Sequence, residues 1–235
     1  MTAHLGLLND ATARLLNTVD GLTDSRWSEP SLLPGWTRAH VVAHLALNAE
    51  GLARASAGVT SGSRVPMYDS NESRDGDIDR LATSTPTELR ERLATGCRDL
   101  SGALAELAPE RLDTMVERTP GRPAFPARDL VDMRWREVEI HHADLGSEYT
   151  ARDWSAEFAD YLLPVAAWDR GGDLDLVLRT PDGEVAVGAG TGPAIEGSAA
   201  ELGWWLVGRG HGEGLSGDLP SLGPWTRRSR PTAAK

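Results

Sequence analysis

The chain reads Arg-Trp-Arg-Glu-Val-Glu-Ile-His-His at residues 134–142, within a helix predicted from about 127 to 145. Gly146 follows where such a helix commonly ends. The inward stripe of this helix carries Leu130, Met133, Glu137, His141 and Asp144. Polar side chains that can bind metals therefore lie on the core-facing side, where an unpaired charge is costly. A bound cation is the simplest partner that would remove this cost.

A third metal-competent side chain, His44, lies far upstream on a helix predicted over about 37–57. Glu137 and His141 are one helical turn apart and therefore point the same way. Together with His44 they offer two imidazoles and one carboxylate. Such a set leaves coordination positions open for water or substrate, which is typical of a catalytic metal site.

Other interpretations of these residues stay open at the level of sequence. Glu137 and His141 also fit a helix-surface pair, or a glutamate bonded to a buried histidine. His40 competes with His44, since the two are one turn apart on the same helix. The spacing is not that of the HExxH metalloproteases, because Val41 occupies the position of the glutamate.

Several nearby polar residues are not assigned as ligands. Asp144 is either an acceptor for an imidazole N–H or, on balance, a surface carboxylate. His142 points about 100° away from His141 and is expected to cap, pack or face solvent. Glu139 and Glu148 fall off the stripe.

Composition narrows the possible partners. Of 235 residues, 35 are acidic and 24 basic, so the net charge of −11 argues against nucleic acid. A small anion still fits if arginines gather at one site. No apolar run approaches the roughly 20 residues of a membrane span, and the N-terminus lacks signal-peptide features, which predicts a cytoplasmic protein. The single cysteine, Cys97, allows no intrachain disulfide, and the absence of an exposed apolar heptad favours a monomer.

The pattern along the chain predicts an α+β protein of two domains. Helices are expected at 3–22, 37–57, 85–107 and 127–145, with a long excursion over 58–84. They suggest a four-helix antiparallel bundle within domain 1–150. A smaller α+β domain, 151–235, contains a helix near 153–168, a hairpin over 174–189 and a helix from Ser198 to Gly208. The basic tail from Arg228 is expected to be mobile.

Arg209 lies directly after the helix terminator Gly208, between two glycines. Its guanidinium is suited to a bidentate grip on a substrate carboxylate. The residues alone favour the simpler role of neutralising the helix C-terminus. His211 in the same loop is given no role, and no GxSxG, P-loop or GxGxxG motif is found.

Four segments resemble, in order, the mycothiol-dependent maleylpyruvate isomerases, which share a DinB-like N-terminal four-helix bundle. These segments are 32–50 (from Leu-Leu-Pro-Gly-Trp), 66–70 (Pro-Met-Tyr-Asp-Ser), 134–146 and 208–210 (Gly-Arg-Gly). The resemblance implies that His44, Glu137 and His141 are zinc ligands and that Arg209 is an arginine needed for activity. It also implies that Pro66 to Tyr68 form a pocket wall.

The implied activity is conversion of maleylpyruvate to fumarylpyruvate in gentisate-type aromatic catabolism. Mycothiol would act as a cofactor, its zinc-bound thiolate adding to the cis alkene and leaving after rotation. Two alternatives stay open: a mycothiol S-transferase acting on another electrophile, and a non-catalytic metal- or small-molecule-binding protein. The ligand set also suits other divalent metals.

Overall fold

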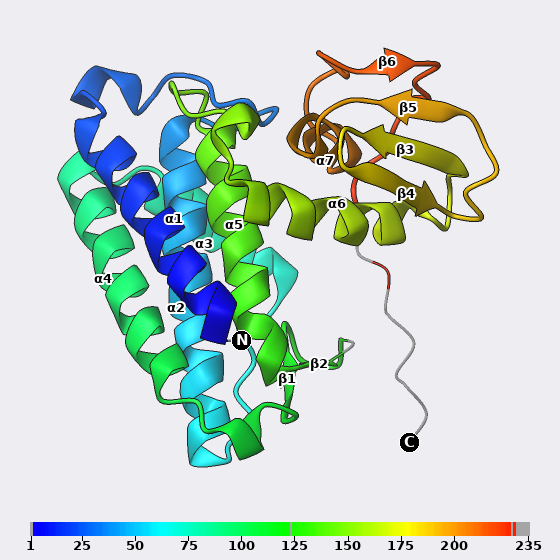
Figure 1. The fold of residues 1–235 in the computed structure, drawn as a ribbon. Coiled ribbons are helices and arrows are strands. Elements are labelled where there is room, and N and C mark those ends of the chain that lie inside the picture. The colour runs from blue at the N-terminus through cyan, green and yellow to red at the C-terminus, as the bar shows by residue number, and fades with distance from the viewer. Residues whose placement is uncertain (1, 123, 227, 229–235) are drawn as a thin grey trace. The chain divides into compact units, whose positions relative to one another are not determined.

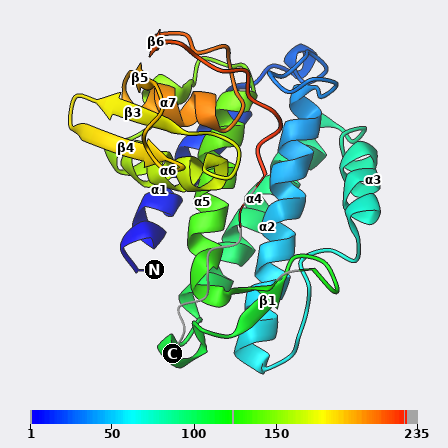
Figure 2. The same ribbon diagram turned by 90° about the vertical axis from the view of Figure 1, so that its right-hand side faces the viewer.

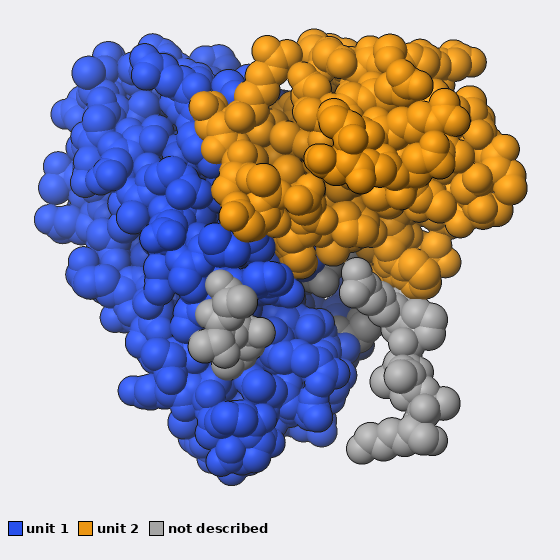
Figure 3. All heavy atoms as spheres, in the orientation of Figure 1, with its two compact units in different colours: residues 1–150 blue, residues 151–235 orange. Residues whose placement is uncertain are grey.

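The computed structural model describes residues 2–122, 124–226 and 228 of the chain. The chain divides into two compact units, Met1–Thr150 and Ala151–Lys235 (Figure 3). Helices and strands occur together, as the sequence predicts. None of the described helices combines the length and apolarity that crossing a bilayer requires.

Four long helices pack along one another in unit 1 (Figures 1 and 2). They are α1 (Thr2–Gly21), α2 (Arg38–Ser61), α4 (Pro86–Ala105) and α5 (Leu130–Asp144). α2 packs against α4 and α5, and α1 packs against the same two helices. Small residues let α2 and α4 approach closely, since a Cβ added at Gly96 would lie 3.4 Å from the Cβ of Ala49. This packing buries the inward stripes of α2 and α5 against each other.

Local sequence signals fix the ends of these helices. Thr85 accepts a hydrogen bond from the backbone N–H of Glu88, whose carboxylate accepts from the Thr85 backbone, so the two residues form a capping box at the start of α4. α2 ends at Gly62, which has φ 76°. α5 begins at Leu130, later than predicted, because residues 127–129 form a 3-10 turn. Gly146 follows α5 with φ 64°, a left-handed conformation that glycine adopts without strain.

The excursion predicted over 58–84 is only partly correct. α2 continues to Ser61, and a further helix, α3 (Asn71–Leu81), occupies much of the rest. Ser70 caps α3 by accepting from the N–H of Ser73. α3 packs on α2 through Ile78 and Leu81, which are buried. It was missed because nearly all its other residues are charged or small, leaving little hydrophobic periodicity.

A short hairpin also went unpredicted. β1 (Met115–Glu117) pairs antiparallel with β2 (Ala124–Pro126). The carbonyl groups of Glu117 and Arg118 accept hydrogen bonds from the backbone N–H groups of Met67 and Tyr68. The hairpin therefore fixes the segment around Tyr68, which is buried.

In its described part, unit 2 contains two α-helices and a small sheet. The helices are α6 (Ala156–Arg170) and α7 (Ala199–Leu206). The sheet has the order β4-β3-β5-β6, from β3 (Leu176–Thr180), β4 (Gly183–Val187), β5 (Ala194–Glu196) and β6 (Ser216–Gly217). The β3–β4 hairpin is antiparallel, as expected, whereas β5 adds parallel to β3. Leu178 faces Val185 on one side and Ile195 on the other.

Ser198 and Glu201 form a capping box at the start of α7. The predicted mobility of the tail concerns residues that lie outside the described part of the chain, except Arg228. The backbone N–H of Arg228 donates to Oδ1 of Asp169 at 3.0 Å.

Truncation of Leu52, which is fully buried on α2, is expected to destabilise unit 1. Leu52→Ala removes a core side chain and leaves a cavity, so the free energy of unfolding should fall by about 2–5 kcal/mol. Urea unfolding followed by circular dichroism measures this change. The matched control is Leu32→Ala, because Leu32 is 57% exposed and should change stability by less than about 1 kcal/mol. Equal effects of the two substitutions would contradict the assigned core.

Candidate metal centre

The structure brings His44, Glu137 and His141 together. Nε2 of His44 lies 2.8 Å, and Nε2 of His141 3.3 Å, from the same carboxylate oxygen, Oε2 of Glu137. The potential ligand atoms all lie within 4.8 Å of one another. The cluster is built from α2 and α5, whose packing sets a residue from position 44 beside residues from positions 137 and 141.

The cluster is buried on one side and open on the other. The His44 and His141 side chains are 4% and 15% exposed, and their rings meet edge to face with centroids 4.6 Å apart. The Glu137 side chain is 32% exposed. A small molecule can therefore approach the cluster from the side of Glu137 while the imidazoles stay in place.

Asp144 orients His141. Oδ2 of Asp144 lies 2.8 Å from Nδ1 of His141, and the Asp144 side chain is fully buried. The preference for a surface carboxylate at Asp144 was wrong, because α5 ends at this residue and turns it beneath the ring. With its Nδ1 proton donated to Asp144, His141 directs Nε2 toward Glu137, and loss of the proton on Nε2 would leave a lone pair there, as metal-binding histidines require.

The three groups perturb each other's protonation. Burial, followed by the nearby charge of His141, lowers the pKa of His44 to about 4. Burial alone would raise the pKa of Glu137, but hydrogen bonds from both histidines hold it well below its usual range. Burial opposes a charge on His141, yet hydrogen bonds to Asp144 and Glu137 outweigh it and raise that pKa. At neutral pH the cluster therefore contains an ionised carboxylate and a neutral His44.

Two buried arginines hold the helices that carry the cluster. Nη1 of Arg134 donates to the backbone oxygen of Leu45 at 2.9 Å and to Oδ1 of Asn48 at 2.7 Å. Nη2 of Arg134 donates to the sulfur of Cys97, which is buried. Arg38 donates from Nε to the carbonyl of Leu145 at 2.8 Å. These contacts tie α5 to α2 above and below the cluster.

The neighbouring histidines have other tasks. Nδ1 of His40 accepts from the backbone N–H of Thr37 and caps α2, so His40 lies outside the cluster. His142 is fully buried, lies 2.8 Å from Oγ1 of Thr18 and stacks on Tyr149. Glu139 is also buried and accepts from Arg14.

Arg74 of α3 is a neighbour that sequence reasoning missed. Its Nη2 lies 3.0 Å from Nδ1 of His44, and its Nη1 donates to Asp75. The contact between Arg74 and His44 depends on α3 packing along α2, and no local pattern in the sequence predicts it. Ser70 as a helix cap, followed by Ile78 and Leu81 at helical spacing, was the available signal for α3.

Arg209 lies in unit 2, directly after α7. Its backbone N–H donates to the carbonyl of Trp204 at 3.1 Å, and its Nη1 donates to the carbonyl of Val207 at 3.1 Å. The guanidinium therefore bonds to the helix C-terminus, which is the simpler of its two predicted roles. His211 is exposed, and its backbone N–H donates to Glu213.

Comparisons with known proteins agree with the resemblance seen in the sequence. The family model described as the mycothiol maleylpyruvate isomerase N-terminal domain matches residues 8–146. A crystal structure of the mycothiol-dependent maleylpyruvate isomerase superposes with a TM-score of 0.87 at 28% identity, covering 95% of this chain and 96% of that one. A crystal structure of a histidine-to-alanine mutant of that isomerase gives the same TM-score and coverage at 27% identity. No curated protein matches the chain.

Replacement of Asp144 by asparagine is expected to lower the pKa of His141 in the metal-free protein. The substitution removes a carboxylate that raises this pKa by hydrogen bonding and by charge. Imidazole NMR titration of the two proteins measures the change, with Asp99→Asn, an exposed residue of α4, as the control.

The same contact has a defined effect on stability. Because folding raises the pKa of His141, the associated stabilisation is full below the unfolded value of about 6.5 and is lost as pH rises through the folded value. The loss of unfolding free energy in Asp144→Asn should therefore shrink between acidic and alkaline pH. A His141 pKa that does not fall in Asp144→Asn would show that Asp144 does not control this ring.

Proposed function

The chain belongs to the mycothiol maleylpyruvate isomerase family, and on this premise we propose that it is a thiol-dependent cis-trans isomerase that converts maleylpyruvate to fumarylpyruvate. The observation that carries the proposal is the convergence of His44, Glu137 and His141 in the part of the chain that the family model matches. Mycothiol is the proposed thiol, and unit 1 is proposed to be the DinB-like bundle domain.

The residues present fit a Zn²⁺ ion. His44 and His141 would bind it through Nε2 and Glu137 through a carboxylate oxygen, a donor set typical of zinc with an open position. A bound zinc would supply Lewis acidity that keeps a thiol ionised at neutral pH, so that its reversible addition would make the double bond single, allow rotation and restore the bond when the thiolate leaves. Other divalent ions accept the same donors.

The residues of the chain have separate tasks in this proposal. The low pKa of His44 keeps its imidazole unprotonated at neutral pH. Asp144 holds the Nδ1 proton of His141 and so fixes which nitrogen of that ring is presented. Glu137 neutralises positive charge at the open edge of the site.

We propose in addition that Arg209 binds a carboxylate of the substrate or the negative charge that develops on it. The carbonyl of Val207 positions one of its terminal nitrogens, and the flanking Gly208 and Gly210 have φ values of 79° and 64°. Glycine adopts these left-handed conformations without strain, whereas a residue with a side chain would be strained at either position.

Two other activities predicted as alternatives use the same site. A mycothiol S-transferase would consume thiol, whereas an isomerase returns it, so thiol titration during turnover separates them. A carrier or sequestering protein would bind without converting its ligand. The cytoplasmic location and the monomeric state stay predictions from the sequence.

Replacement of His44 by alanine is expected to abolish both metal binding and isomerisation. The variant loses one of three proposed ligands, so kcat/KM for maleylpyruvate with mycothiol should fall about a thousandfold or more. Zinc content by mass spectrometry and absorbance of the product measure the two effects. The matched control is His40→Ala, which removes a histidine one turn away that caps α2. Full zinc content in His44→Ala would contradict the ligand assignment.

Arg209→Gln is expected to keep its zinc but to lose about 10- to 100-fold in kcat/KM, the value of a charge-assisted hydrogen bond. Arg179→Gln is the control, because Arg179 is an exposed arginine of β3 in the same unit, paired with Glu184. An unchanged kcat/KM in Arg209→Gln would show that Arg209 only stabilises the C-terminal end of α7 and does not act on the substrate.

A further inference from the structure

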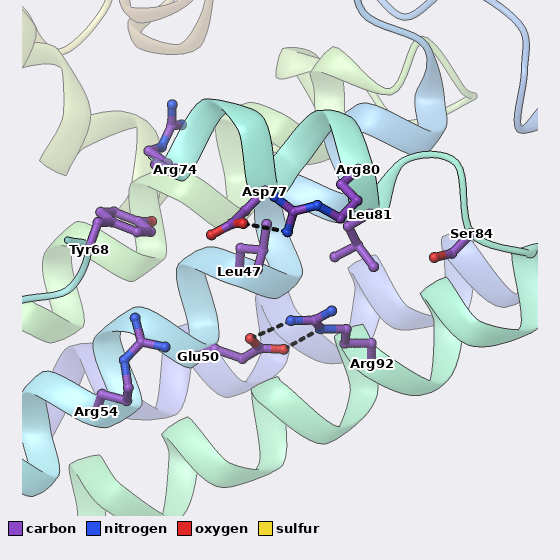
Figure 4. Close-up of a pocket in the computed structure, with 10 residues that line it drawn as sticks. All are labelled: Leu47, Glu50, Arg54, Tyr68, Arg74, Asp77, Arg80, Leu81, Ser84 and Arg92. Atoms are coloured by element: carbon purple, nitrogen blue, oxygen red, sulfur yellow. Dashed lines mark hydrogen bonds and ion pairs between the residues drawn. The ribbon is translucent and has the colours of Figure 1, made fainter. Parts of the chain in front are cut away.

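A pocket of about 280 Å³ lies in unit 1 beside the histidine–glutamate cluster. Its walls come from α2, α3 and α4 and from the segment around Tyr68 (Figure 4). Two of its lining residues connect it to the cluster. Arg74 contacts His44, and burial together with the charge of Glu137 raises the pKa of Tyr68. The volume is near the lower end of small-molecule sites, roughly 300–1,000 Å³, and so suits a compact ligand.

The lining of this pocket is basic in a chain whose net charge is −11. It includes four arginines, Arg54, Arg74, Arg80 and Arg92, but only two acidic residues, Glu50 and Asp77. Each acid is already engaged, because Arg92 grips Glu50 with two hydrogen bonds and Arg80 pairs with Asp77 (Figure 4). The positive charge that is left over belongs to Arg54, because Arg74 pairs with Asp75, which lies outside the lining.

Arg54 is positioned without an acidic partner in the described part of the chain. Its Nη2 donates to the carbonyl of Met67 at 2.5 Å, which places the guanidinium next to Tyr68. In Figure 4 the Arg54 side chain and the Tyr68 hydroxyl both point into the pocket. A second arginine, Arg118, lies over the Tyr68 ring at 5.3 Å and adds to the positive field there.

Arg74 is held in a position that metal binding would undo. A guanidinium N–H can only donate, so Nδ1 of His44 accepts from Arg74 and its proton resides on Nε2, facing Glu137. A metal at Nε2 would move that proton to Nδ1, where it would oppose the Arg74 N–H. Nε of Arg74 is meanwhile buried without a hydrogen-bond partner among the described atoms. Loading of the metal site would therefore remove the hydrogen bond to His44 and leave Asp75 as the side-chain partner of Arg74, which Figure 4 shows directed away from Arg54.

We propose that Arg54, Arg74 and Tyr68 form a carboxylate-binding subsite that positions an anionic substrate beside the metal centre, with Arg74 joining it when the metal is bound. This inference rests on the proposed function for the identity of the substrate, but the basic pocket itself does not depend on catalysis. A carboxylate here would meet two guanidinium groups, the strongest common donors for it.

Maleate, a compact cis dicarboxylate, is the probe, and its binding is measured by calorimetry on the full-length protein without thiol, so that nothing can react. In the zinc-loaded protein, Arg54→Gln and Arg74→Gln should each raise the Kd of maleate about tenfold or more. Arg54→Lys, which keeps the charge, should recover part of the affinity. In the metal-free protein Arg74→Gln should have little effect, because Arg74 is then bound to His44.

The charge-matched control is Arg98→Gln, an exposed arginine of α4 bonded to Thr95 and outside this pocket, which should bind maleate as the wild type does. Zinc content and circular dichroism of each variant confirm that the site and the fold survive. Absence of maleate binding in the wild type, or an equal Kd in wild type, Arg54→Gln and Arg74→Gln, would overturn the subsite. Isomerase assays test the proposed function separately from the subsite. A protein that binds maleate in this pattern but does not isomerise maleylpyruvate would refute only the proposed function.

Discussion

A single carboxylate oxygen shared by two imidazoles is the interaction on which the site depends. Oε2 of Glu137 meets Nε2 of His44 and Nε2 of His141, and His44 lies 93 residues before Glu137 in the chain. Each polar group placed between packed helices costs about 1–3 kcal/mol if it lacks a partner. The three side chains of the cluster partner one another, and a bound divalent cation would offset the remaining cost of burying them. The cluster therefore exists only where α2 packs on α5, and its hydrogen bonds in turn stabilise that packing.

The two histidines are supported in opposite ways. His141 rests on the buried carboxylate of Asp144, which suits a ring that presents a lone pair at Nε2. His44 instead faces the guanidinium of Arg74, which suits a ring whose proton is on Nε2. The first arrangement already places the Nδ1 proton where a metal-bound ring needs it, whereas the second would have to change if a metal were bound. This asymmetry would couple the proposed metal centre to α3 and to the basic pocket that α3 lines.

The sequence allowed the centre to be predicted because helical periodicity is local. His44, Glu137 and His141 each lie on a stripe that can be read within a few turns, and Thr85 and Ser198 mark helix starts by their capping partners. The error at Asp144 came from its position at the last turn of α5, where burial depends on how the chain leaves the helix. The α3 helix was not predicted because most of its residues are charged or small. Only Ile78 and Leu81 pack on α2, which is too few for a clear hydrophobic periodicity.

The contacts that escaped prediction join distant parts of the chain. Arg74 and His44 are thirty residues apart, and the backbone of Tyr68 is held by a hairpin that begins at Met115. Only the folded positions of these segments bring them together. The role of Arg209 stays a prediction carried by the family resemblance and by its place after α7.

X-ray absorption at the zinc edge of the zinc-loaded protein tests the central claim most directly. Two imidazole nitrogens at about 2.0–2.1 Å and a carboxylate oxygen at about 2.0–2.2 Å are the expected shell, with one ion per chain. A chain that takes up no divalent ion, or a bound zinc whose spectrum lacks imidazole scattering, would contradict the account.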